Sequence, residues 1–105
     1  MRKTNPILEQ IKKTAEQFLP CSEVILFGSR ARKDAPPESD YDTLIVIENT
    51  LGPKEKFQLR TKIRKALLEK GIRSDILIQS KEEIERKRAL PGHFIRSILK
   101  DAIYL

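Results

Sequence analysis

The stretches EVILFGS (residues 23–29) and SDYDTLIVI (residues 39–47) decide the fold of this chain. Their runs of β-branched, aromatic and other apolar residues predict two strands, at 23–27 and at about 41–48, and a glycine ends the first. Gly28 can adopt backbone angles closed to other residues and lets a ligand approach the main chain. Ser29 opens a candidate short helix over residues 29–33, whose first N–H groups would attract anions. The Gly28-Ser29 turn is therefore predicted to hold phosphate.

Three aspartates stand at the starts of predicted strands. Asp40 and Asp42 are two residues apart, so in a strand they share one face while Tyr41 points to the other. Two such carboxylates repel each other unless a cation lies between them, and Mg²⁺ prefers carboxylate and phosphate oxygens. Asp75 begins a third apolar run, at 74–79. If that strand lies beside the Asp40/Asp42 strand, three carboxylates converge at one end of a sheet.

Helical patterns surround these strands. Asn5 is expected to cap a first helix, with Pro6 at its first position. Pro53 begins a second, and Gly71 stands where a helix C-terminal glycine is expected. Ser80-Lys81-Glu82-Glu83 has the capping-box pattern of a third helix. Two further segments complete the chain: an amphipathic helix after Pro91-Gly92 and a short strand at 102–105. This order favours an α/β or α+β fold with a mixed sheet.

Composition sets the frame for function. The chain has 105 residues, 39% hydrophobic and 34% charged, which predicts one soluble globular domain spanning residues 1–105. It has no apolar run of membrane-spanning length and no secretory signal pattern, so we expect a cytoplasmic protein. The net charge of +6 is spread along the chain and interleaved with glutamates, without arginine/aromatic alternation. Solvated helix faces are therefore favoured over a nucleic-acid patch.

Four other residues are candidates for a functional role, and a purely structural role is the alternative for each. Cys21 is the only cysteine, so an internal disulfide is excluded. His93 follows Pro-Gly, where a helix-start or solvent-facing role is favoured over that of a catalytic base. Tyr41 is expected in the core rather than at the metals. Tyr104 is expected to pack at the sheet edge rather than against a partner.

The chain resembles the nucleotidyltransferases of the DNA polymerase beta superfamily, and most closely their minimal nucleotidyltransferase (MNT) group. The resemblance rests on Gly28-Ser29-Arg30-Ala31-Arg32, then Ser39-Asp40-Tyr41-Asp42, then Asp75 in an apolar strand. It spans residues 24–78, and three elements agree in order and spacing. Family members often carry glycine where this chain has Lys33 or Asp34. The resemblance implies a small mixed twisted sheet flanked by helices.

The resemblance also implies a nucleotide site. Gly28 and Ser29 would hold the triphosphate of ATP, Ser29 through its hydroxyl and its backbone N–H. Arg30 and Arg32 lie beside this turn and are candidate nucleotide-binding residues, with full exposure as the alternative.

The implied reaction needs two Mg²⁺ ions held by Asp40, Asp42 and Asp75. One ion would bind the triphosphate tail, and the other would bring an acceptor hydroxyl towards the α-phosphate. Asp75 would complete the second metal site and take up or steer the acceptor's proton. In-line attack would then release pyrophosphate, with the rate gain coming from charge neutralisation and positioning.

The acceptor defines the remaining alternatives. Larger relatives carry a further domain for their acceptor, so this short chain is expected to meet its acceptor as another protein. MNT proteins are commonly paired with a helical HEPN toxin, and some act as antitoxins by transferring AMP to a toxin tyrosine. A non-catalytic antitoxin that masks its toxin by contact is one alternative, disfavoured by the intact carboxylates. Transfer to a small molecule such as an aminoglycoside, or to an RNA end, is another.

Overall fold

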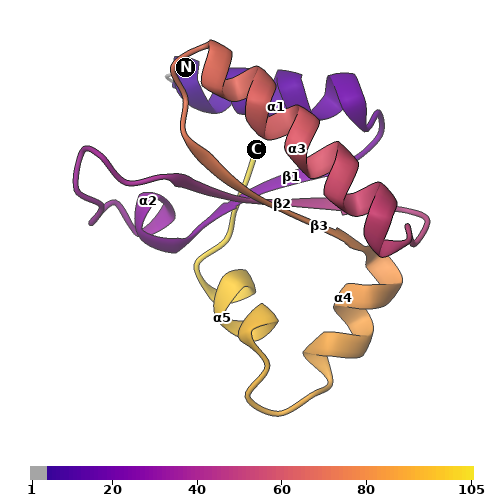
Figure 1. Ribbon diagram of the computed structural model, residues 1–105. Coiled ribbons are helices and arrows are strands. Elements are labelled where there is room, and N and C mark those ends of the chain that lie inside the picture. The colour runs from indigo at the N-terminus through magenta and orange to yellow at the C-terminus, as the bar shows by residue number, and fades with distance from the viewer. Residues whose placement is uncertain (1–4) are drawn as a thin grey trace.

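The structure, a computed structural model, describes residues 5–105 (Figure 1). Helices and strands follow one another with boundaries close to those that the sequence predicts. In chain order the elements are α1 (Pro6–Phe18), β1 (Glu23–Phe27), α2 (Gly28–Arg32), β2 (Tyr41–Ile47), α3 (Pro53–Glu69), β3 (Ser74–Ser80), α4 (Lys81–Arg88), α5 (Phe94–Lys100) and β4 (Ile103–Tyr104).

The four strands form one mixed sheet in the order β3-β2-β1-β4. β1 runs antiparallel to both β2 and β4, whereas β2 and β3 are parallel. A parallel pair needs a crossover connection, and α3 supplies it. The predicted mixed sheet is therefore confirmed, and the strand of Asp75 does lie beside the strand of Asp42.

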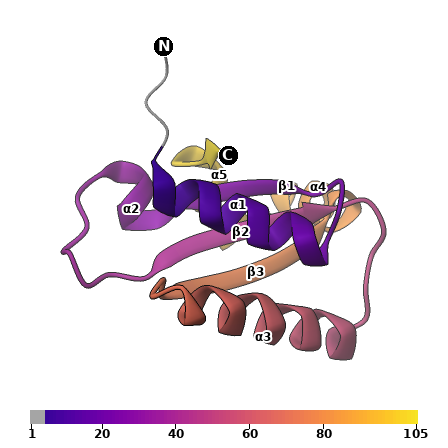
Figure 2. The ribbon, with the colours of Figure 1, turned by 90° about the horizontal axis from the view of Figure 1, so that it is seen from above.

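Helices cover both faces of the sheet (Figures 1 and 2). α1 and α3 lie on one face, and α4 and α5 lie on the other. Because side chains alternate along a strand, β2 contributes Ile45 and Ile47 to the core under α1 and α3, and Leu44 and Val46 to the core over α4 and α5. A strand buried on both sides explains the unbroken apolar run of β2.

The helix ends follow the predicted capping chemistry. Oδ1 of Asn5 accepts hydrogen bonds from two N–H groups of the first turn of α1, at 2.9 and 3.4 Å. Gly71 has φ +77°, and its N–H donates to a carbonyl of the last turn of α3 at 2.9 Å. At the start of α4, the Ser80 hydroxyl accepts from the Glu83 N–H at 3.0 Å, and the Glu83 carboxylate accepts from the Ser80 N–H at 2.8 Å.

Three single-residue expectations are also tested. His93 caps α5, because its Nδ1 accepts a hydrogen bond from the Ile95 N–H at 3.1 Å, and the structural interpretation is confirmed. Tyr41 is half-buried and packs against the core under α1 and α3, as expected. The packing expected for Tyr104 is wrong: it is 65% exposed, since β4 is a two-residue edge strand with a partner on one side only. None of the helices within residues 5–105 is long and apolar enough to cross a membrane.

Candidate active site

The turn between β1 and α2 is built against Asp42. The last residue of β1, Phe27, pairs with Asp42 of β2, and Gly28 follows at φ +73°. A Cβ at Gly28 would collide with Oδ2 of Asp42 and would lie 3.3 Å from its Cγ. Two separate features thus require glycine at position 28: the positive φ of its backbone and the close approach of the Asp42 carboxylate. Ser29, the next residue, is half-buried in the first turn of α2.

Asp42 and Asp75 are neighbours by register. They pair directly in the parallel ladder of β2 and β3. Paired residues on adjacent strands have backbones about 4.8 Å apart and point to the same face of the sheet. That face is the one covered by α5, so two carboxylates are fixed side by side at the end of the sheet.

The neighbouring carboxylates affect the pKa of Asp42. Partial burial raises the pKa of the Asp42 carboxyl above its usual value, and the negative charges of Asp75 and Asp40 raise that pKa further. The guanidinium of Arg32 acts in the opposite direction. The site therefore concentrates negative charge, which favours a bound cation.

Asp40 is held differently from the other two aspartates. It lies one residue before β2, is 50% exposed at its side chain, and faces Arg73 with Nε and Oδ1 3.6 Å apart. Within residues 5–105, no three His, Cys, Asp or Glu side chains are gathered closely enough to hold a metal ion. The convergence of three carboxylates is thus realised for Asp42 and Asp75, whereas Asp40 is turned to an arginine. The donors are all carboxylate oxygens, which fit Mg²⁺.

The two arginines of α2 contact different parts of the protein, because residues two apart lie on opposite sides of a helix. Arg32 lines the cavity beside Asp75, and its guanidinium bonds to Asp101 at 3.1 Å and to Asp34 at 3.2 Å. Arg30 turns away from that cavity towards the loop that precedes β2. Its guanidinium donates to the carbonyls of that loop.

Lys33 ends α2 in the left-handed conformation, with φ +63°. This is one of the two positions at which the resemblance leads us to expect glycine, and the left-handed backbone angle would favour glycine there. A side chain in this region costs about 1–2 kcal/mol. Lys33 adopts the left-handed conformation despite this cost.

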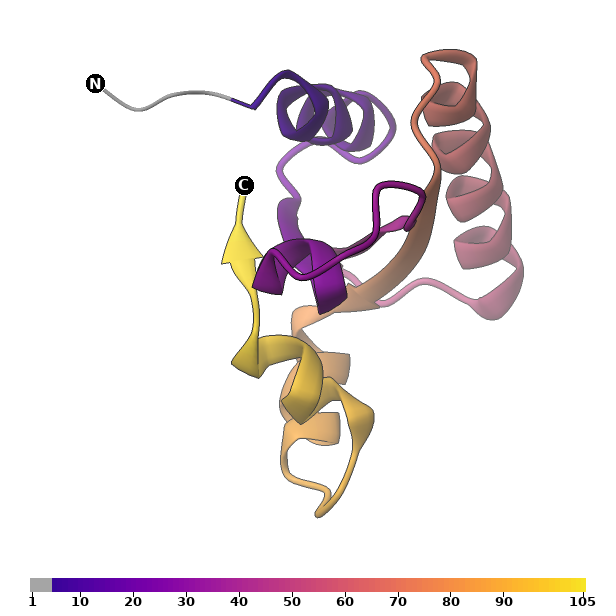
Figure 3. The same cartoon turned by 90° about the vertical axis from the view of Figure 1, so that its left-hand side faces the viewer.

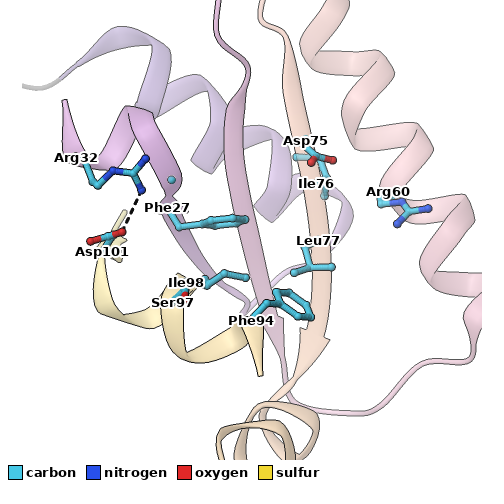
Figure 4. A pocket seen from close by; sticks show the side chains of 11 residues that line it. Phe27, Arg32, Arg60, Asp75, Ile76, Leu77, Phe94, Ser97, Ile98 and Asp101 are labelled. Atoms are coloured by element: carbon cyan, nitrogen blue, oxygen red, sulfur yellow. Dashed lines mark hydrogen bonds and ion pairs between the residues drawn. The ribbon is translucent and has the colours of Figure 1, made fainter. Parts of the chain in front are cut away.

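A cavity of about 500 Å³ opens beside Asp75 (Figure 4). Arg32 and Asp101 lie together on one side of it, Asp75 lies across from them on β3, and Arg60 projects from α3 on the far side of β3. The floor is apolar, with the rings of Phe27 and Phe94 among its side chains. Sequence reasoning missed Arg60, Phe94 and Asp101, because only the tertiary packing of α3 and α5 brings them to the site. The complete lining is Phe27, Gly28, Arg32, Arg60, Asp75, Ile76, Leu77, Phe94, Ser97, Ile98 and Asp101.

Two features indicate the class of protein: the mixed sheet, and the Gly28 turn that lies against Asp42, which is paired with Asp75. The chain belongs to the nucleotidyltransferase domain family, whose model matches residues 8–105. No curated protein matches the chain significantly by sequence.

Solved structures share this fold. A toxin–antitoxin structure with AMP-PNP is 20% identical, with a TM-score of 0.62, and the match covers 91% of this chain and 69% of that one. A complex of a tri-AMPylated HEPN toxin from Shewanella oneidensis with its MNT antitoxin is 18% identical, with a TM-score of 0.58, over 93% and 67%. A structure provisionally described as a minimal nucleotidyltransferase is 25% identical, with a TM-score of 0.56, over 92% and 87%. These neighbours are consistent with an MNT-type protein.

Proposed function

We propose that this protein is a Mg²⁺-dependent nucleotidyltransferase that transfers AMP from ATP to a hydroxyl group of a partner protein. The partner proposed is a helical HEPN toxin in the cytoplasm, to which this chain acts as antitoxin. The observation that carries the proposal is the register of Asp42 and Asp75 beside the Gly28 turn. The structural neighbour that contains an MNT antitoxin with a tri-AMPylated HEPN toxin supports the choice of partner.

The residues of this chain divide the work of such a reaction. Asp42 and Asp75 would hold Mg²⁺ together with Asp40, and Mg²⁺ would supply neutralisation of the phosphate charge. Gly28 lets the Asp42 carboxylate lie against the main chain of the turn, and the next residue, Ser29, would offer a hydroxyl and an N–H to the triphosphate. Arg32 and Asp75 both line the cavity, where Arg32 would supply positive charge and Asp75 would accept the proton of an acceptor hydroxyl.

The cavity supports a macromolecular acceptor. It is open to solvent beside Asp75, and Phe94 on its floor is 52% exposed. A side chain of a partner protein could thus reach the carboxylates from the α5 side without displacing any element of the fold. The exposed ring of Phe94 is the kind of surface that aromatic or aliphatic residues of a partner cover.

The test is transfer of label from α-labelled ATP to the product of the adjacent reading frame, in the presence of Mg²⁺. Asp42→Asn and Asp75→Asn should each reduce labelling roughly a hundredfold or more, since each removes charge from the reacting centre. Glu48→Gln is the matched control, because Glu48 is an exposed carboxylate whose ion-pair partner among residues 5–105 is Lys81 alone. Full labelling by Asp42→Asn would refute the catalytic assignment. Toxin neutralisation without any labelling would favour masking by contact.

A further inference from the structure

The loop between α2 and β2 carries Asp40 but has little regular structure of its own. Residues 34–40 lie outside any helix or strand, and β2 begins only at Tyr41. Figure 3 shows this loop projecting at the end of the sheet beside α2. The ladder that fixes Asp42 and Asp75 therefore does not fix Asp40. Something else has to set the position of this carboxylate.

Arg30 holds the loop from the side of α2. Its Nη2 donates to the carbonyls of Pro37 and Ser39, both at 2.8 Å, and its Nε donates to Ser39 at 3.2 Å. The guanidinium carbon also lies 4.4 Å from the ring centroid of Tyr41. A planar fork that stacks on a ring and bonds two carbonyls at once is a geometry that arginine provides and lysine does not.

Arg73 holds the same loop from the side of β3. Its Nη2 donates to the carbonyl of Glu38 at 2.6 Å, and its Nε lies 3.6 Å from Oδ1 of Asp40. The backbone carbonyl of Arg73 also accepts the N–H of Tyr41 at 3.0 Å. Three consecutive loop carbonyls, at positions 37, 38 and 39, are thus bound by two arginines from two separate elements.

We propose that Arg30 and Arg73 are positioning residues that clamp the 34–40 loop and thereby set Asp40 for metal binding. The metal role rests on the proposed function, because it takes Asp40 as a metal ligand. The clamp replaces the nucleotide-binding role expected for Arg30 from the sequence, since its guanidinium is already committed to the loop. Arg73 has a second effect, because its charge faces Asp40 until a divalent cation competes for that carboxylate.

The test uses Arg30→Lys and Arg73→Gln in the full chain. Arg30→Lys keeps the charge but loses the fork, and Arg73→Gln keeps a donor but loses the charge. Arg88→Lys is the matched control, because within the part of the chain that the structure describes Arg88 pairs with Glu85 alone, on the exposed side of α4 and remote from the loop. Three quantities are measured: backbone amide exchange of the peptide covering 34–41, the dissociation constant of Mn²⁺, and the melting temperature.

Both clamp variants should exchange loop amides at least about tenfold faster and bind Mn²⁺ about tenfold more weakly, with melting temperatures near that of the wild type. Wild-type exchange in both variants, or faster exchange with unchanged Mn²⁺ affinity, would overturn the proposal. If Arg30→Lys binds ATP more weakly in EDTA and exchanges its loop amides at the wild-type rate, Arg30 is a nucleotide-binding residue and the clamp is refuted. If the wild type binds no Mn²⁺, the proposed function fails, and the exchange measurement still decides whether the clamp exists.

Discussion

Replacing Gly28 with alanine tests whether the phosphate turn and the metal-binding strand are built against each other. Two costs should add. A side chain at φ +73° costs about 1–2 kcal/mol. A Cβ that collides with Oδ2 of Asp42 also forces this carboxylate off its rotamer, which costs about 1 kcal/mol more. The free energy of unfolding should fall by about 2–3 kcal/mol.

A thermal scan makes this magnitude measurable. For 105 residues the unfolding entropy is about 0.2 kcal/mol per kelvin, so Gly28→Ala should lower Tm by about 9–14 °C. Gly71→Ala is the matched control, because Gly71 has φ +77° but nothing within 4 Å of its Cβ position. It should show only the backbone cost and lose about 5–9 °C.

A double-mutant cycle isolates the contact itself. In an Asp42→Ala background the colliding oxygen is gone, and the remaining Cβ lies at an ordinary contact distance of 3.4 Å. Gly28→Ala should then cost about 1 kcal/mol less than in the wild type. Equal costs in the two backgrounds, or equal costs for Gly28→Ala and Gly71→Ala, would show that the carboxylate does not constrain the turn.

Three further perturbations follow from single residues. Asp42→Asn should raise Tm at neutral pH in EDTA, because the pKa of Asp42 is raised in the folded state, so that the wild-type fold is stabilised by protonation of Asp42 and loses this stability as pH rises. The gain in Tm should vanish below pH 3.8, the usual pKa of an aspartate, and a gain in Tm that persists there would contradict the electrostatic explanation. Lys33→Gly should add about 1 kcal/mol in urea unfolding, since it relieves the left-handed side chain at φ +63°, and a loss of stability would refute this. Burial raises the pKa of Glu83, but the hydrogen bonds from Lys56 and Ser80 outweigh burial and leave that pKa below its usual value of 4.5. The ionised Glu83 carboxylate therefore stabilises the fold above pH 4.5, and this contribution is lost as Glu83 is protonated. Lys56→Met should therefore cost about 2 kcal/mol at pH 7 and much less under acid conditions, as measured by urea unfolding at both pH values.

The sequence predicted what local pattern and alternation control. The strand of Asp75 could be recognised from its apolar run. The shared face expected for Asp40 and Asp42 from their spacing stays a prediction, because β2 begins at Tyr41 and Asp40 lies before it. The register that sets Asp42 directly beside Asp75 depends on the length and packing of α3, which no local pattern encodes. That pairing is therefore a finding of the structure.

Arg30 shows why the rest could not be predicted. Its place next to Gly28-Ser29 in the sequence favoured a nucleotide contact, and Arg32 shared that interpretation. The direction of each side chain depends on how the five residues of α2 sit on the sheet, and this turns one arginine to the cavity and the other to the loop. Arg60 carried no signal at all, because it is one of many basic residues on an exposed helix.

The three aspartates differ in how positive charge offsets their mutual repulsion. Carboxylates brought to a common point repel one another unless positive charge lies between them. In this fold positive charge comes from the protein, with Arg73 at Asp40 and Arg32 near Asp42. The register fixes Asp42 and Asp75, so under the proposed function it is Asp40, at the end of a loop, that would exchange its arginine for a metal ion. The exposure of both partners keeps that ion pair weak, and it can therefore yield to a divalent cation.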